Sequence, residues 1–207
     1  MTPADWDLAL FRAIHHGMHQ RWLDPIMVWL TEPGPWKIPL LCLIGALFVI
    51  KGRRGLIGVL VLALTITAAD QLSSHVLKPV FRRARPSETL RDTLPLFGVR
   101  HSYSFPSSHA TNFFAAAPVI SAVFPQSTVV AYMVAAAVSF SRIYVGDHYP
   151  LDVIVGAALG LGLGFLGRKA YRRLVRTLLQ RKGVVVGGVP EPVKISARGE
   201  QAPSGGP

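Results

Sequence analysis

Three short stretches of this chain carry positive charge, hydroxyl groups and histidine within a largely apolar sequence. They run from Lys78 to Pro86, from Pro106 to His109 and from Ser141 to Asp152. The residues in these stretches whose side chains could bind a substrate or take part in a reaction are Lys78, Arg85, Ser107, Ser108, His109, Arg142, His148 and Asp152. A phosphoryl group in transfer carries negative charge on its equatorial oxygens, which a protein has to position and neutralise. This set of cations, hydroxyls and imidazoles therefore predicts phosphoryl transfer.

Each group suits a part of that reaction. Arg85 and Arg142 offer planar forks that can hold two oxygens, and Lys78 offers a compact point charge. Ser107 and Ser108 precede an apolar run, so their hydroxyls and backbone N–H groups are expected to face an anion at the start of a helix.

The spacing of these residues resembles the signature of the type-2 phosphatidic acid phosphatase (PAP2) family, written K-x6-R-P, P-S-G-H and S-R-x5-H-x3-D. The first and third parts match in full, whereas Ser108 stands where the second part usually has glycine. The resemblance covers about residues 78–152. It implies that His148 is the nucleophile and forms a phosphohistidine, that Asp152 holds the other ring nitrogen, and that His109 protonates the leaving oxygen. It also implies that the three cations and the two serines bind phosphate.

Composition indicates a membrane protein. Of 207 residues, 50% are hydrophobic and 16% charged, with a mean hydropathy of +0.37. The net charge of +11 comes from basic residues at the ends of apolar runs, which argues against a nucleic-acid partner. The single cysteine, Cys42, supports no disulfide framework, and no His, Cys, Asp and Glu set at metal-ligand spacing is evident. We therefore expect no metal and no cofactor.

The predicted fold class is all-α: a polytopic transmembrane helical bundle with a PAP2/haloperoxidase-like core. About five spans are expected, at residues 36–50, 55–77, 110–124, 128–146 and 151–167. Residues 4–20 predict an amphipathic helix lying in the interface, and Trp22 to Leu30 a short interfacial or re-entrant piece that ends before Pro33.

The chain is expected to divide into three parts: an N-terminal interfacial segment (1–35), a membrane-embedded phosphatase domain with a basic end (36–182) and a disordered tail (183–207). The basic segments 51–54 and 168–182 fall on one side, which the positive-inside rule places in the cytoplasm together with the C-terminus. The motifs then face the outside of a bacterial inner membrane.

Several other ionisable residues have plainer interpretations. Arg82, Arg83 and Arg91 are interpreted as anchors at the ends of spans, and Asp147 as a solvated neighbour of His148. Asp70 and His75 should face the interior of the bundle. The N-terminal histidines His15, His16 and His19 have no accompanying ligand set that predicts a metal site.

The predicted function is a metal-independent membrane lipid phosphatase. Among the family's substrates, undecaprenyl diphosphate is the one favoured by a short chain with extra cations near the motifs. Phosphatidylglycerophosphate, phosphatidate and lipid A phosphates stay open, as does phosphotransfer to another lipid. A catalytically silent anion-binding scaffold or transporter is the non-enzymatic alternative, and the oligomeric state stays open too.

Overall fold

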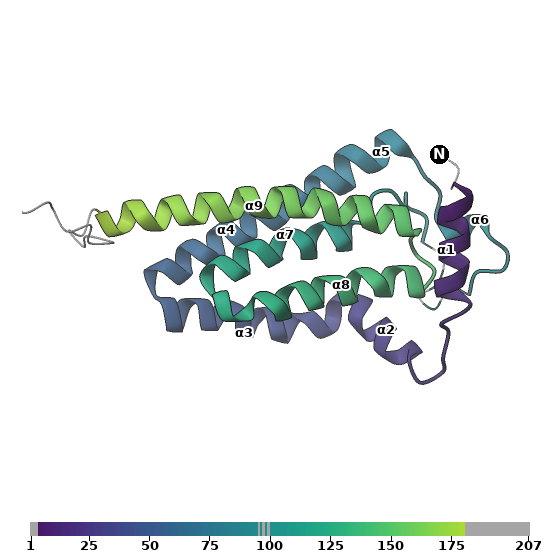
Figure 1. The fold of residues 1–207 in the computed structure, drawn as a ribbon, viewed down its shortest axis with the longest axis horizontal. Helices are drawn as coiled ribbons and strands as arrows, with labels where there is room; N and C mark the ends of the chain where they lie inside the picture. The colour runs from purple at the N-terminus through teal and green to yellow at the C-terminus, as the bar shows by residue number, and fades with distance from the viewer. Residues whose placement is uncertain (1–3, 95, 97, 99, 181–207) are drawn as a thin grey trace, which may run out of the picture.

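The computed structural model of the protein describes residues 4–94, 96, 98 and 100–180. All regular structure in these residues is helical, and the long helices run side by side (Figure 1). In chain order the elements are α1 (Asp5–His15), α2 (Asp24–Thr31), α3 (Pro33–Lys51), α4 (Arg53–Asp70), the π-helix η1 (Gln71–Leu77), α5 (Lys78–Phe81), α6 (Pro86–Thr89), α7 (Ser108–Val123), the 3-10 helix η2 (Pro125–Ser127), α8 (Thr128–Tyr144) and α9 (Pro150–Gln180). The prediction of an all-α bundle is confirmed.

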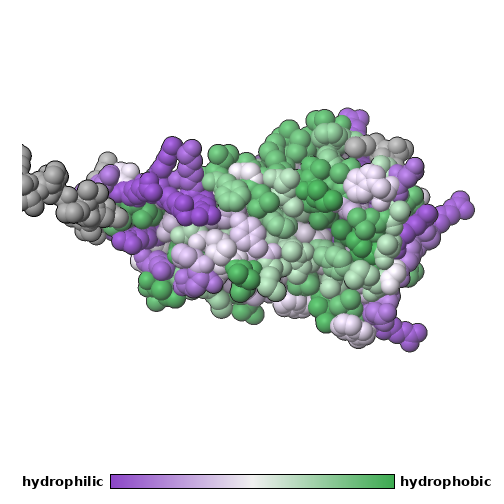
Figure 2. Space-filling view, in the orientation of Figure 1, coloured by the Kyte–Doolittle hydropathy of each residue, from purple (hydrophilic) through white to green (hydrophobic). Residues whose placement is uncertain are grey.

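Four helical segments of the described chain are long and apolar enough to cross a membrane: Pro33–Lys51, Arg53–Thr89, Pro125–Tyr144 and Pro150–Gln180. The expected run 110–124 forms α7, which has 16 residues and is shorter than the roughly 20 of a typical span. It packs against α4, α8 and α9. Hydrophobic residues cover the middle of the bundle and hydrophilic ones gather at its two ends (Figure 2). The protein is a multi-pass membrane protein.

Glycines let α9 approach α7 closely. Gly156, Gly160 and Gly164 recur every four residues and so share one face of α9. A Cβ added at Gly160 would lie 2.3 Å from the backbone oxygen of Thr111, and one at Gly156 would lie 2.6 Å from that of Ser107. Small residues at such spacing are how membrane helices bring their backbones together. This contact also brings the start of α9 to the start of α7, where two of the motifs meet.

The N-terminal helix lies across one end of the bundle rather than alongside the spans (Figure 1). Its Phe11 is fully buried and packs with Ala110, Tyr149 and Val153 in a small apolar cluster. The Phe11 ring also stacks on His15, with centroids 5.1 Å apart. This anchorage holds α1 against the ends of α8 and α9. A larger apolar cluster, centred on Leu62 and Val119, lies between the spans.

The predicted tail, residues 183–207, lies outside the described residues. The last expected span, 151–167, is longer than predicted, because α9 continues through the basic residues to Gln180. The short piece expected from Trp22 to Leu30 is the helix α2.

Candidate active site

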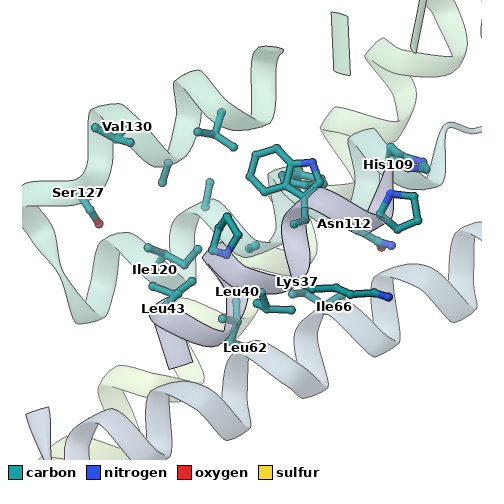
Figure 3. Close-up of a pocket in the computed structure, with 18 of the residues that line it drawn as sticks. Lys37, Leu40, Leu43, Leu62, Ile66, His109, Asn112, Ile120, Ser127 and Val130 are labelled. Atoms are coloured by element: carbon teal, nitrogen blue, oxygen red, sulfur yellow. The ribbon is translucent and has the colours of Figure 1, made fainter. Parts of the chain in front are cut away.

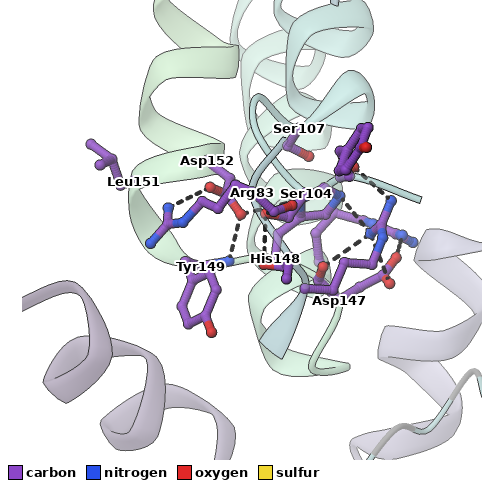
Figure 4. A network of polar contacts seen from close by, with 12 residues as sticks. Arg83, Ser104, Ser107, Asp147, His148, Tyr149, Leu151 and Asp152 are labelled. Carbon is purple, nitrogen blue, oxygen red and sulfur yellow. Dashed lines mark hydrogen bonds and ion pairs between the residues drawn. The ribbon is translucent and has the colours of Figure 1, made fainter. Parts of the chain in front are cut away.

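The three motif stretches meet at the end of the bundle that α1 covers (Figure 4). His148 belongs to the loop between α8 and α9 and is almost fully buried. The loop turns at Gly146, whose φ of 82° is a conformation that favours glycine. Its backbone N–H groups at Asp147 and His148 both donate to the carbonyl of Arg142, at 3.1 Å. The turn therefore fixes His148 beside the last turn of α8.

The two ring nitrogens of His148 face opposite charges. Its Nε2 lies 3.2 Å from Nη1 of Arg85, and its Nδ1 lies 3.5 Å from Oδ2 of Asp152. A guanidinium can only donate, so Nε2 accepts and the ring proton sits on Nδ1, which faces the carboxylate but has no hydrogen-bond partner among the described residues. Burial lowers the pKa of His148 well below 6.5, and the cations Arg85, Arg142 and Lys78 lower it further, as does His109. The ring is therefore neutral, with its lone pair on Nε2 directed at the cations.

Several hydrogen-bond acceptors hold the Arg85 guanidinium in place. Its Nε donates to the carbonyl of Ser102 at 2.7 Å, its Nη2 donates to the Ser102 hydroxyl at 2.9 Å, and its Nη1 donates to the carbonyl of Asp147 at 3.0 Å. The guanidinium also forms an ion pair with the Asp147 carboxylate at 2.9 Å. These contacts fix the fork against His148.

Arg142 is buried and bonded at both ends of its fork, to Thr31 and to the carboxylate of Asp147. Its Nε is also buried, and it has no hydrogen-bond partner among the described residues. The interpretation of Asp147 as solvated is wrong: its side chain is 3% exposed and it pairs with both Arg85 and Arg142. The reason is the tight turn before it, which folds the carboxylate back onto cations that would otherwise repel each other.

Asp152 lies in the first turn of α9, and both of its carboxylate oxygens are engaged. Oδ1 accepts from Nη1 of Arg83 at 2.5 Å, and Oδ2 accepts from the backbone N–H of Tyr149 at 2.9 Å. Its backbone carbonyl accepts from the N–H of Ser107 at 3.0 Å. The expectation that this N–H faces an anion is therefore wrong for Ser107. Its buried hydroxyl, in contrast, lacks a partner in the described part of the chain and remains available to a ligand.

The interpretation of Arg83 as a span anchor is also wrong. The residue is 1% exposed, and besides Asp152 its fork binds Asp7 of α1 at 2.5 Å. Its guanidinium lies over the ring of Tyr149, 4.2 Å from the centroid. Its neighbour Arg82 is exposed. A signal for this contact existed in the sequence, because Asp7 shares a helical face with Phe11 and His15, and a carboxylate on a buried face requires a cation.

Ser108 uses its hydroxyl in a contact between helices. Its Oγ lies 2.9 Å from Oγ of Ser74, which in turn donates to Oδ1 of Asp70 at 3.4 Å. Asp70 also accepts from the side-chain amide of Asn112 at 3.1 Å, as its predicted place in the interior requires. His75 is exposed, so the same expectation is wrong for it; it lies on the outward side of the π-helix η1.

The remaining predicted residues border the same space. Lys78 is partly buried at the start of α5 and lies within electrostatic range of Arg85 and Arg142. His109 lies within electrostatic range of Arg142 and Lys78, and it also lines a cavity of about 610 Å³. All eight predicted site residues therefore gather at this end of the bundle.

The cavity extends from His109 and Asn112 along α3, α4, α7 and α8 (Figure 3). Its wall is mainly apolar, with side chains such as Leu40, Leu62 and Ile120. It could hold a hydrocarbon chain whose polar end reaches His109. Among the described residues, no group of three or more His, Cys, Asp or Glu side chains could hold a metal ion.

Comparison with known proteins gives consistent similarities. Residues 59–176 match the PAP2 superfamily. The chain is 32% identical to the lipid A 4'-phosphatase of Porphyromonas gingivalis over 75% of its own length and 69% of that protein. It is 33% identical to the undecaprenyl-diphosphatase of Sulfolobus acidocaldarius over 78% of its length and 76% of that protein. The crystal structure of the first transmembrane PAP2 type phosphatidylglycerolphosphate phosphatase from Bacillus subtilis superposes with a TM-score of 0.62 at 30% identity, covering 82% of this chain and 88% of that one.

Proposed function

The chain belongs to the PAP2 superfamily, and on this premise we propose that it is a membrane lipid phosphatase that works through a phosphohistidine on His148. The observation that carries the proposal is the state of this imidazole. It is neutral and buried, with Nε2 directed into a cluster of cations and Nδ1 directed at Asp152. An unprotonated Nε2 beside fixed positive charge can attack phosphorus once a phosphoryl group takes the place of the hydrogen bond from Arg85.

In the first step, Nε2 of His148 attacks phosphorus and the bond from phosphorus to the lipid-side oxygen breaks. His109, which lines the apolar cavity and lies within electrostatic range of Arg142 and Lys78, takes up a proton together with the anionic substrate and gives it to that oxygen. Asp152 stabilises the imidazolium through Nδ1–H. Lys78, Arg85 and Arg142 neutralise the phosphoryl oxygens, and two buried atoms without partners in the described chain, Ser107 Oγ and Arg142 Nε, offer further hydrogen bonds.

In the second step, water attacks the phosphohistidine. His109, now neutral, takes a proton from the water as its oxygen bonds to phosphorus. The bond between phosphorus and Nε2 breaks, which releases inorganic phosphate and returns both histidines to their starting state. No metal and no cofactor enters either step.

The proposed substrate is undecaprenyl diphosphate, cleaved to undecaprenyl phosphate. It is supported by the similarity to an undecaprenyl-diphosphatase and by the apolar cavity that ends at His109. A lipid A phosphate is the second candidate, favoured by the similarity to a lipid A 4'-phosphatase. The proposed setting is a bacterial inner membrane with the site facing outward and the C-terminus in the cytoplasm, because the basic ends at 51–54 and 168–180 lie away from the site.

The experiment is phosphate release by the purified protein in detergent. Undecaprenyl diphosphate, undecaprenyl phosphate, phosphatidylglycerophosphate, phosphatidate and lipid A are supplied separately, with His148→Ala as the blank. We expect the highest kcat/KM with undecaprenyl diphosphate. A higher value with lipid A would reassign the substrate. If neither the wild type nor His148→Ala releases phosphate from any of these lipids, the protein is an anion-binding scaffold or transporter rather than a phosphatase.

A further inference from the structure

One buried arginine, Arg83, joins the N-terminal helix α1 to the start of α9. Arg83 donates a 2.5 Å hydrogen bond from Nη1 to the carboxylate of Asp152 (Figure 4). It donates a second one, also of 2.5 Å, from Nη2 to the carboxylate of Asp7. The three side chains are 1%, 0% and 0% exposed. None of the phosphoryl-transfer steps described above uses Arg83 or Asp7. Burying the charges of Arg83 and Asp7 costs desolvation free energy, which only close pairing and hydrogen bonds offset.

We propose that Asp7 and Arg83 are positioning residues of the active site, which hold the Asp152 carboxylate in the orientation that stabilises the His148 imidazolium. This inference rests on the proposed function, with His148 as the nucleophile. The geometry around Asp152 supports these positioning roles.

Asp152 has little freedom to rotate. Arg83 holds Oδ1 while the Tyr149 N–H holds Oδ2, and Oδ2 is also the atom 3.5 Å from Nδ1 of His148. A carboxylate fixed at both oxygens presents the same lone pair to the imidazole before and after attack. Without Arg83, the carboxylate would keep the backbone contact but could turn about it. A lysine at position 83 could reach only one of the two carboxylates, because it lacks the fork.

Asp7 extends this support to the start of α9. Its Oδ2 binds Arg83, and its Oδ1 accepts from the backbone N–H of Leu151 at 2.8 Å. That N–H belongs to the first turn of α9, where helices have unsatisfied donors. Asp7 thus caps the helix that carries Asp152 while also orienting the arginine. It lies outside the region that matches the family, residues 59–176, so the inference adds the interfacial helix α1 to the site.

The charges along this chain of contacts alternate. Asp7, Arg83 and Asp152 lead from α1 to Nδ1 of His148, while Arg85 faces its Nε2. The other titratable groups acting on the ring are Arg142, Lys78 and His109. Arg83 is therefore the cation on the Asp152 side of the imidazole. Removing its charge should leave Asp152 free to pair with a protonated ring, which would raise the pKa of His148.

The test uses the full-length protein in detergent with one lipid phosphate substrate that the wild type hydrolyses. Arg83→Lys, Arg83→Gln and Asp7→Asn are compared with the controls Arg82→Gln and Asp5→Asn, which change exposed residues next to each site or on the same helix. For each, kcat, KM, the thermal unfolding midpoint and the dependence of kcat/KM on pH are measured.

We expect Arg83→Lys and Asp7→Asn to lower kcat about 10- to 100-fold, the effect of losing one charge-assisted hydrogen bond, with KM within about twofold of the wild type. Arg83→Gln should in addition move the acid limb of kcat/KM to higher pH, whereas Arg83→Lys, which keeps the charge, should leave it in place. Both controls should match the wild type. A purely structural role would lower the unfolding midpoint without moving the acid limb.

Each outcome decides the matter. If Arg83→Lys and Asp7→Asn have the kcat of their controls, the inference is wrong even though the phosphatase function stands. If Arg83→Gln does not fold, the test rests on Arg83→Lys and Asp7→Asn, in which kcat should fall while KM stays within about twofold of the wild type. If the wild type releases no more phosphate than His148→Ala with any lipid, the proposed function fails first, and this inference fails with it.

Discussion

Replacing Arg142 with lysine separates gripping a phosphoryl group from merely supplying a positive charge. The arginine fork bonds both Thr31 and Asp147, and its Nε is buried without a partner in the described residues. A lysine keeps the charge but can serve only one of these directions at a time. Either Thr31 or a phosphoryl oxygen then loses a donor.

The magnitude follows from that loss. A hydrogen bond to a charged group contributes about 1.5–3 kcal/mol, so Arg142→Lys should slow turnover roughly 10- to 150-fold. Leaving a buried acceptor such as Thr31 without a donor should also cost about 1–3 kcal/mol of folding free energy. The protein should nevertheless insert and fold, because the ammonium can still pair with Asp147.

The assay is phosphate release from undecaprenyl diphosphate by detergent-purified protein, with the thermal unfolding midpoint measured in parallel. Arg82→Lys is the matched control, since Arg82 is exposed and its Nε donates only to the carbonyl of Pro79, at 3.0 Å. We expect the control to keep its turnover and its unfolding midpoint. Equally mild effects at both positions would refute the place of Arg142 in the phosphate site, and lost stability with unchanged turnover would make it purely structural.

Three further outcomes test the mechanism. Phosphate release should continue in excess EDTA, because Lys78, Arg85 and Arg142 already supply the charge that the phosphoryl oxygens need; loss of turnover that Mg²⁺ restores would contradict this. His148→Ala should reduce turnover to background and abolish trapping of ³²P on the protein, and near-normal turnover would move the nucleophile elsewhere. The pKa of His148 is lowered in the folded protein, so the unfolded state takes up a proton first as the pH falls below about 6.5. The free energy of unfolding should therefore fall below that pH by up to about 1.4 kcal/mol per pH unit, and by less in His148→Gln. An unchanged slope in that variant would argue against a neutral buried ring.

The motif spacing could predict that these residues lie close together, because they stand at fixed offsets on local structure. Asp152 follows His148 by four residues, and α9 begins between them at Pro150, so one short turn suffices to bring the two together. Proline at the first position of a helix is a local signal that needs no knowledge of the rest of the fold. The helical class was equally accessible, since apolar runs in a membrane must satisfy their backbone hydrogen bonds internally.

What the sequence did not reveal depends on contacts between distant segments. Arg83 is the middle residue of an Arg-Arg-Ala run at the end of a span, and only its pairing with Asp7 distinguishes it from the exposed Arg82 beside it. Asp147 likewise takes its importance from two arginines on different elements. Whether a charged residue anchors a span or belongs to the site depends on which residue lies opposite it in the fold. The spacing of residues along the sequence does not give that partner.

The charged groups at the site explain why so many cations can lie buried together. Arginine forks and carboxylates alternate in space, so that Asp147 lies between Arg85 and Arg142, and Arg83 lies between Asp7 and Asp152. The cluster as a whole consists of Lys78, Arg83, Arg85 and Arg142 with Asp7, Asp147 and Asp152. Its cations outnumber its carboxylates by one, before any contribution from Arg100, which lies 3.9 Å from Asp147.

That residual positive charge matters because of where it lies. The carboxylates of Asp7 and Asp152 are occupied by Arg83 and by backbone donors. The positive charges of Arg85 and Arg142 act on Lys78 more strongly than the carboxylates of Asp70 and Asp152 do. A lipid phosphate that enters from the cavity would meet positive charge at this end of the bundle, while its chain would stay among the apolar side chains of the cavity. Asp152 lies on the Nδ1 side of His148, opposite Arg85 at Nε2, and there it would stabilise the imidazolium of the proposed mechanism. In the proposed mechanism, binding of an anionic lipid headgroup and activation of His148 would therefore draw on one arrangement of charge.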